Sequence, residues 1–406
     1  MKNLYGLTCL QFKCLKINAP KIHLSINYKI FVLKSYLFCI TVWRYLVLIF
    51  FIFSKKNSFL NIENNKSVIM KNSPLKICDA TIQPGERITL ALPTPEIYTC
   101  SPMHIPIHVI HGKKAGPTLL ICAAIHGDEV NGVSIIHRLL NLSLLKSIYG
   151  TIIAVPVVNV YGLIARSRNL PDRRDLDGSF PGSETGSFAA RLAHLFSNEI
   201  LSKSTHVIDI RTGEPYYNKL PQVHTIINEE TEQMAKAFQA PVILKSSSKK
   251  GLLWLVEEEN SKATLIYEAG QALRIQDLSI RLGIKGIINV MRHLKMIPAA
   301  KTKKTKRESF VINKSNWVRA PGSGICRLYK KLGSHVNEGD LLAGIIDPFG
   351  TEQKYKIFAP FEGVIIAENN LSLVNEGEPL LKLAKTKEAE KVVSQMEDFK
   401  NEQYQY

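Results

Sequence analysis

His126 and Glu129 are the residues of this chain whose types and spacing are best suited to chemistry. They lie in the sequence AAIHGDEVNG at residues 123–132. An imidazole and a carboxylate three residues apart in one turn can reach the same cation, and this pair of donors suits catalytic Zn²⁺. Such a pair also occurs as ordinary surface or helix-capping residues. Its position directly after an apolar run, residues 118–124, favours the metal interpretation.

The residues around this pair predict a strand, a turn and a helix. The apolar run at 118–124 is typical of a buried strand, and residues 130–145 have a helical pattern. Open α/β folds bind their ligands at the carboxyl ends of the strands. We therefore expect the side chains of the turn to lie at such an edge.

The same alternation continues along the chain. Residues 75–113 are interpreted as short strands with Pro-rich turns. Further strands are predicted at 150–158, 206–210, 223–227 and 264–267, and helices at 188–201, 230–238 and 275–294. This order predicts an α/β fold with a mixed, mostly parallel sheet flanked by helices.

A cationic loop follows the predicted strand at 150–158. It contains Arg166 and Arg168, and then Arg173 and Arg174. Guanidinium groups bind carboxylates in bidentate fashion, so this loop suits a carboxylate-bearing substrate. The alternative is that some of these arginines pair with the aspartates at 172, 175 and 177 of the same loop.

Two more strands end in polar residues. The segment HVIDIRTG, residues 206–213, runs from a strand into a polar turn, and Glu268 follows the strand at 264–267. A carboxyl group at the end of a buried strand can have a raised pKa and act as a general base. A helix-capping or salt-bridged glutamate is the structural alternative.

Taken in chain order, these segments resemble the succinylglutamate desuccinylase/aspartoacylase family, relatives of the zinc carboxypeptidases. Family members show His-Gly-x-Glu, then Arg with Asp-Leu-Asn-Arg and Phe-Pro-Gly, then Asp-x-His-Thr-Gly, and finally a Glu near Gly. The resemblance covers roughly residues 75–297. It implies that His126 and Glu129 bind one zinc ion, that Glu268 activates the zinc-bound water, and that Arg168 holds the substrate or polarises its carbonyl. The implied reaction is hydrolysis of an N-acyl amide of an amino-acid-like substrate.

Three working positions depart from the family pattern. Arg211 stands at the position of the third ligand, a histidine, and Asp177 and Gly178 replace the Asn-Arg pair that holds the substrate carboxylate. Arginine stays protonated and has no lone pair to donate. At ~4 Å from Zn²⁺ its charge would be repelled by roughly 8 kcal/mol at an effective dielectric constant of about 20. Two protein ligands would remain where catalytic zinc usually has three.

His224, on the next predicted strand, is a candidate replacement ligand. Arg211 would then bind substrate together with Arg166 and Arg168. His206 is too distant, because five strand residues at about 3.3 Å each separate it from position 211. Two hypotheses therefore stay open: a zinc-dependent hydrolase, and a catalytically impaired relative that binds a small ligand or a partner.

The charge of the chain is concentrated at its N-terminus. The net charge is +17, of which residues 1–72 contribute +10 through eleven Lys/Arg and one acid, leaving +7 for the remainder. This excess is too small to predict a nucleic-acid partner. The seven cysteines are scattered, so we interpret them as reduced thiols. The sequence leaves a homo-oligomer open.

Residues 36–53 are apolar apart from Arg44, and 18 residues just suffice for a membrane span. The segment is a poor signal peptide, because it starts late and no cleavage site follows. Residues 1–69 also differ in composition from the rest, and Met70 would be an ordinary start. We expect a cytoplasmic protein, with membrane anchoring through residues 36–53 as the alternative.

The C-terminal part contains an internal repeat. APGSG at 320–324 matches APFEG at 359–363, and NEGDLLAGI at 337–345 matches NEGEPLLKL at 375–383. Two similar β-rich halves predict a small all-β barrel-sandwich domain at 316–385. It resembles biotinyl and lipoyl modules, but it has no lysine at the hairpin tip. We accordingly divide the chain into an N-terminal extension, 1–69; an α/β domain, 70–298; a basic linker, 299–315; the barrel; and a charged, frayed tail, 386–406.

Overall fold

A large mixed β-sheet organises the protein in the computed structural model, which describes residues 70–98, 103–226, 228–245, 251, 262–300, 309–350, 353–386 and 388–401. Residues 1–69, with the candidate membrane segment at 36–53, lie outside the described residues. No helix in the described part of the chain is both long and apolar enough to cross a bilayer.

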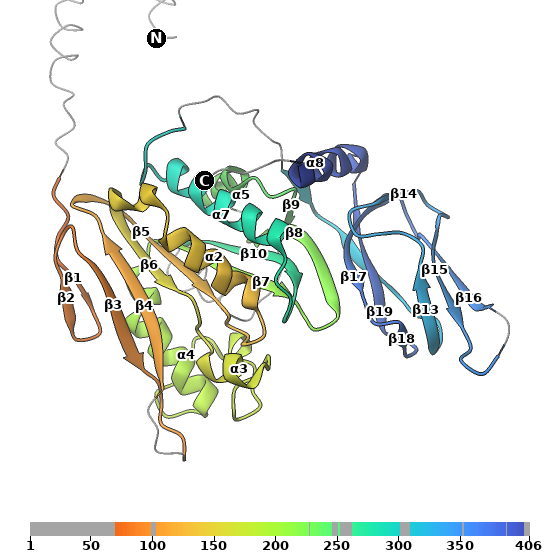
Figure 1. Cartoon of the computed structure of the whole chain (residues 1–406), viewed down its shortest axis with the longest axis horizontal. Helices are drawn as coiled ribbons and strands as arrows, with labels where there is room; N and C mark the ends of the chain where they lie inside the picture. Colours follow the sequence, from red (N-terminus) through yellow and green to blue (C-terminus); the bar gives the residue numbers. More distant parts are fainter. Residues whose placement is uncertain are drawn as a thin grey trace, which may run out of the picture. The chain divides into compact units, whose positions relative to one another are not determined.

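Four parallel strands form the centre of this sheet (Figure 1). In spatial order they are β6 (Tyr149–Val155), β5 (Lys114–Ala123), β7 (His206–Gly213) and β10 (Ala263–Gln271). Antiparallel strands flank them, with β4 (His104–His111) and β3 (Arg87–Pro93) on one side and β8 (Tyr217–Thr225) on the other. The predicted mixed, mostly parallel sheet is thus confirmed.

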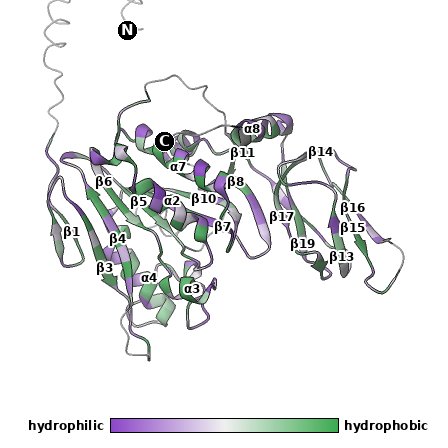
Figure 2. Ribbon diagram, viewed as in Figure 1, coloured by the Kyte–Doolittle hydropathy of each residue, from purple (hydrophilic) through white to green (hydrophobic). Residues whose placement is uncertain are grey.

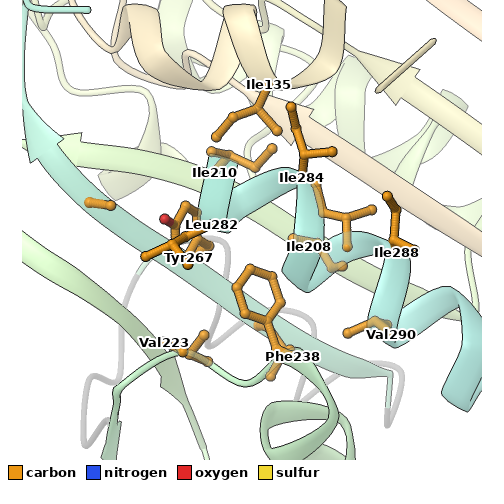
Figure 3. Close-up of a cluster of buried hydrophobic side chains, with 14 of the residues drawn as sticks. Ile135, Ile208, Ile210, Val223, Phe238, Tyr267, Leu282, Ile284, Ile288 and Val290 are labelled. Atoms are coloured by element: carbon orange, nitrogen blue, oxygen red, sulfur yellow. The ribbon is translucent and has the colours of Figure 1, made fainter. Parts of the chain in front are cut away.

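Helices cover both faces of the sheet. Helices α2 (Val130–Leu140), α5 (Glu229–Phe238) and α7 (Asp277–His293) pack against one face, and α3 (Val160–Ala165) and α4 (Phe188–Glu199) against the other. Strand side chains alternate between the two cores, so Ile208 belongs to the first cluster and its neighbour Val207 to the second. Figure 3 shows Ile208 beside α7. Figure 2 shows hydrophilic and hydrophobic stretches alternating along α7, and its buried residues include Ile284 and Ile287.

Shorter elements complete this part of the chain. Strands β1 (Leu75–Ile77) and β2 (Ala80–Ile82) pair with each other, and β9 (Val242–Lys245) pairs with β8. Short 3-10 helices lie at η1 (Ser143–Lys146), η2 (Asp177–Ser179) and η3 (Leu201–Lys203). The helix expected at 130–145 ends at Leu140, because Asn141 turns back and donates its side-chain amide to the carbonyl of His137.

The C-terminal region is β-rich, as the repeat predicts. Its strands form the outer end of the large sheet and a separate four-stranded sheet. A small core lies between them and includes Val336, Leu342 and Ile365. The strands are β12 (Ser315–Arg319), β13 (Gly324–Leu328), β14 (His335–Val336), β15 (Leu341–Ile346), β16 (Gln353–Phe358), β17 (Gly363–Asn369), β18 (Leu373–Val374) and β19 (Pro379–Lys385). Because β17 pairs with β8, the large sheet runs from one region into the other without interruption.

Two segments differ from expectation. The segment taken as a linker contributes β11 (Phe310–Ile312), which pairs in parallel with β9 and so belongs to the large sheet. The tail expected to be frayed forms helix α8 (Ala389–Asn401). Its residues Val392, Met396 and Phe399 are buried, since their spacing places them on one face of a helix.

Candidate active site

The predicted metal pair lies in the turn between β5 and α2. His126 and Glu129 are both almost completely buried, and His126 Nδ1 lies 3.0 Å from Glu129 Oε1. Glu129 Oε1 is also 3.4 Å from the backbone nitrogen of Thr212, so its carboxylate connects this turn to the end of β7. Gly127 permits the tight turn, because a Cβ there would lie only 1.9 Å from the backbone carbon of Gly162.

The loop after α3 supplies a second set of charges. The side chain of Asn159 caps α3 by accepting a hydrogen bond from Gly162, and its amide donates to the carbonyl of Arg168. Arg168 Nη2 donates to Asp175 Oδ2 at 3.2 Å. The other oxygen of Asp175 lies 3.1 Å from His126 Nε2. The imidazole is therefore held between two carboxylates, one on each ring nitrogen.

These two carboxylates set the charge of the imidazole. Burial alone would lower the pKa of His126, but Glu129 and Asp175 outweigh it and raise the pKa to about 9. Burial would raise the pKa of Asp175, whereas contact with His126 and the charge of Arg168 hold it well below its usual range. Both groups are thus charged at neutral pH.

Arg211 lies at the end of β7, where the family pattern has a histidine. Only 9% of it is exposed. Its two terminal nitrogens each donate to one oxygen of Asp177 at 2.8 Å, and Nε donates to Asp209 Oδ2 at 2.6 Å. The guanidinium therefore does not swing out to solvent but closes a bidentate pair with Asp177, itself one of the three departures from the family pattern.

Burial and neighbouring charges shift the pKa values of Arg211 and Asp209 in opposite directions. Burial opposes the charge of Arg211, but Asp209 and Asp177 raise its pKa well above its usual value. Burial raises the pKa of Asp209 to about 6, although Arg211 opposes the rise. At pH 7 and above we therefore expect a charged Arg211 beside an ionised Asp209.

Glu268, the predicted base, is the cross-strand neighbour of Arg211, and both lie on the same face of the sheet. Its Oε1 accepts a hydrogen bond from Lys219 Nζ at 2.7 Å, and its Oε2 accepts one from Gln222 at 3.1 Å. His224 Nε2 lies 2.9 Å from the same Oε2. Burial would raise the pKa of Glu268, but Lys219 and His224 bring it well below its usual value.

The structure brings most of the predicted residues together. His126, Glu129 and Arg168 share one network through Asp175, while Arg211 and Glu268 are neighbours on adjacent strands. Arg166 is exposed at the left-handed end of α3, and His224 contacts Glu268. The zinc-ligand role of His224 stays a prediction.

Sequence reasoning missed three partners in this site. Asp209 carried a signal, because it lies two residues before Arg211 and a strand places such residues on the same face. Lys219 and Gln222 carried none. Their contact with Glu268 depends on the antiparallel register between β8 and β10.

The residues at this position do not fit a zinc ion. Among the described residues, no group of three or more His, Cys, Asp or Glu side chains is arranged to hold a metal. The third ligand position holds a guanidinium, which has no lone pair to donate to a metal. We therefore derive no chemical step through a metal.

Residues 115–294 match the model of the succinylglutamate desuccinylase/aspartoacylase catalytic domain. This part of the chain is similar to that family. It is 25% identical over 299 residues to the N-alpha-acetyl-L-2,4-diaminobutyric acid deacetylase of Halomonas elongata, a match that covers 70% of this chain and 86% of that protein. At the family level the chain is therefore a deacylase or amidohydrolase type of protein.

Solved structures of family members have the same fold. The product-bound ectoine utilization protein EutE (DoeB) of Ruegeria pomeroyi has a TM-score of 0.67 and 25% identity, and the match covers 78% of this chain and all of that one. The succinylglutamate desuccinylase/aspartoacylase of Rhodobacter sphaeroides also has a TM-score of 0.67, with 23% identity and 78% and 98% coverage. The family likeness therefore includes the β-rich C-terminal region.

Proposed function

We propose that this chain binds a small N-acyl amino acid or a related carboxylate at its family site without hydrolysing it through zinc. This is the catalytically impaired alternative of the two hypotheses. The Halomonas relative is by name a deacetylase of an N-acetylated diamino acid, which supports N-acyl amino acids as the ligand class.

The observation that carries this proposal is the environment of Glu268. A general base must be free to take a proton from water, and its pKa should lie near the working pH. Both oxygens of Glu268 already accept hydrogen bonds, from Lys219 and Gln222, and the ammonium charge stabilises the ionised form. Such a carboxylate is a poor proton acceptor at neutral pH.

Arg168 is the residue that we expect to receive the ligand. About a third of its side chain is exposed, and its contact with Asp175 is made by one terminal nitrogen, Nη2. A guanidinium has five N–H donors, so a ligand carboxylate can bind beside Asp175. Arg166, exposed on the same loop, adds positive charge nearby.

The other hypothesis, zinc-dependent hydrolysis with Glu268 as the base, is favoured by one observation. The pair His126 and Glu129 is intact, buried and held at 3.0 Å. Arg211 would then bind substrate. Its full engagement with Asp177 and Asp209 speaks against that role, since ligand binding would first have to break a buried bidentate pair.

The test combines binding and turnover on the full chain. Calorimetry would be run with N-α-acetyl-L-2,4-diaminobutyrate, N-acetyl-L-aspartate and N-succinyl-L-glutamate, and release of free amine would be followed with and without added zinc. We expect saturable binding of at least one ligand and no zinc-dependent release. Zinc-dependent release of the amine would establish the hydrolase instead, and absence of binding by all three ligands would refute the proposal.

A matched pair of variants locates the binding site. Arg168→Gln should weaken binding at least tenfold, because the ligand carboxylate loses its charged partner. Arg174→Gln is the control, since this arginine lies on the same loop but its side chain is 64% exposed. Equal affinities of the two variants would place the ligand elsewhere.

A further inference from the structure

We propose that the guanidinium of Arg211 replaces the metal cation of this centre, and that Arg211 and Asp177 are the two halves of a single charge exchange. Arginine stands for the histidine of the family pattern and aspartate for its asparagine. Considered separately, each change damages a zinc site. Considered together, they place a fixed cation and its own anion where the family pattern has neutral side chains.

The contacts of Arg211 support this replacement. Each of its three guanidinium nitrogens donates to a carboxylate oxygen, two of Asp177 and one of Asp209, at 2.6 to 2.8 Å. The next residue, Thr212, places its backbone nitrogen 3.4 Å from the carboxylate of Glu129, a predicted metal ligand. Arg211 therefore lies at the metal end of the site, and its positive charge is directed into a group of acidic side chains.

Asp177 is held in place by the same network. Its backbone N–H donates to Asp175 Oδ1 at 2.9 Å, and Asp175 in turn contacts His126. Asp177 lies in the short helix η2, and its carboxylate thus contacts Arg211, which lies 34 residues further along the chain. Gly251 lies against this carboxylate, because a Cβ there would be only 2.8 Å from Asp177 Oδ1.

The third departure is compatible with the same exchange. A Cβ at Gly178 would meet no atom of the described residues within 4 Å, which leaves room among them for a larger side chain. The arginine of the family pattern at this position would directly follow Asp177, whose carboxylate contacts Arg211. Once Arg211 supplies the cation, Asp177 needs no second guanidinium from the next position, which is compatible with glycine there.

The proposal predicts that zinc binding is regained only when the exchange is reversed. Arg211→His alone supplies the missing imidazole but removes the guanidinium that contacts Asp177 and Asp209. Asp177→Asn alone keeps the repelling guanidinium and should bind no zinc. The double variant Arg211→His/Asp177→Asn restores the family pair and should bind about one zinc per chain.

The experiment uses the full chain and Zn²⁺ alone as the probe. Each protein is equilibrated with zinc chloride and passed through a desalting column, and its zinc content is measured by elemental analysis. Thermal unfolding with and without zinc gives a second readout, because a metal that binds only the folded state raises the midpoint. We expect zinc to bind the double variant and raise its midpoint, and to do neither for the native chain.

Arg138→His is the matched control, because Arg138 lies in the last turn of α2 and forms an exposed ion pair with Asp277. It makes the same chemical change and should bind no zinc. Stoichiometric zinc on the native chain would overturn the proposal, and this measurement needs no variant to fold. A folded double variant that stays free of zinc would overturn it equally. Both outcomes are independent of whether N-acyl amino acids bind, so failure of the proposed function is recognised separately.

Discussion

Replacing Arg211 by methionine should destabilise the fold in a pH-dependent way. The substitution keeps an unbranched side chain but removes the guanidinium that contacts Asp177 and the completely buried Asp209. Removing one partner of a buried ion pair costs about 3–5 kcal/mol, because the remaining charge is left without compensation. An exposed pair contributes only about 0–1 kcal/mol. We therefore expect a loss of about 3–5 kcal/mol in the free energy of unfolding at pH 8.

The dependence on pH follows from Asp209. Its pKa in the folded protein is already raised from 3.8 to about 6, chiefly by burial, and loss of Arg211 removes the nearest group that lowers it. The folded state of the variant then binds a proton that the unfolded state releases. Stability accordingly falls as the pH rises from about 4 through the folded pKa. The loss caused by Arg211→Met should be smaller at pH 5 than at pH 8.

Urea unfolding followed by circular dichroism at the two pH values measures this loss. Arg138→Met is the control and should change stability by less than about 0.5 kcal/mol, because its ion pair is exposed. An unchanged stability at pH 8 would show that the contacts of Arg211 contribute nothing net. An equal loss at both pH values would show that Asp209 does not take up the proton.

Three further predictions concern other parts of the structure. Lys219→Met should cost about 3 kcal/mol at pH 7, because Glu268 loses the ammonium group of Lys219. The loss should shrink as the pH falls below the usual pKa of a glutamate and through the depressed pKa of Glu268, and urea unfolding at a series of pH values from 7 down to 2 checks both. Phe399→Ala should cost about 3–5 kcal/mol by leaving a cavity under α8, and an unchanged urea midpoint would mean that this helix does not pack as described. Gly251→Ala should lower the thermal midpoint, because φ is +87° there and the new Cβ would meet the Asp177 carboxylate; a midpoint equal to that of the native chain would contradict this contact.

The order of strands and helices could be predicted from the sequence because it depends on local patterns. Apolar runs, turn residues and helical spacing are properties of short segments, and these placed His126 and Glu129 in one turn and Glu268 at the end of a strand. The boundaries were less predictable. Helix α2 ends at Leu140, and α8 forms where a frayed tail was expected, because its apolar face is stabilised by packing against the rest of the fold.

The sequence by itself determined which groups are present at the family positions, including the three that depart from the family pattern. Only the tertiary structure decided which of those side chains contact each other. Asp177 and Arg211 are 34 residues apart, and no local pattern indicates that one carboxylate meets one guanidinium face to face. The contact of Lys219 with Glu268 likewise depends on the register between two strands. Long-range charge pairing is set by how elements pack, because Coulomb interactions depend on distances in space and not on separation along the chain.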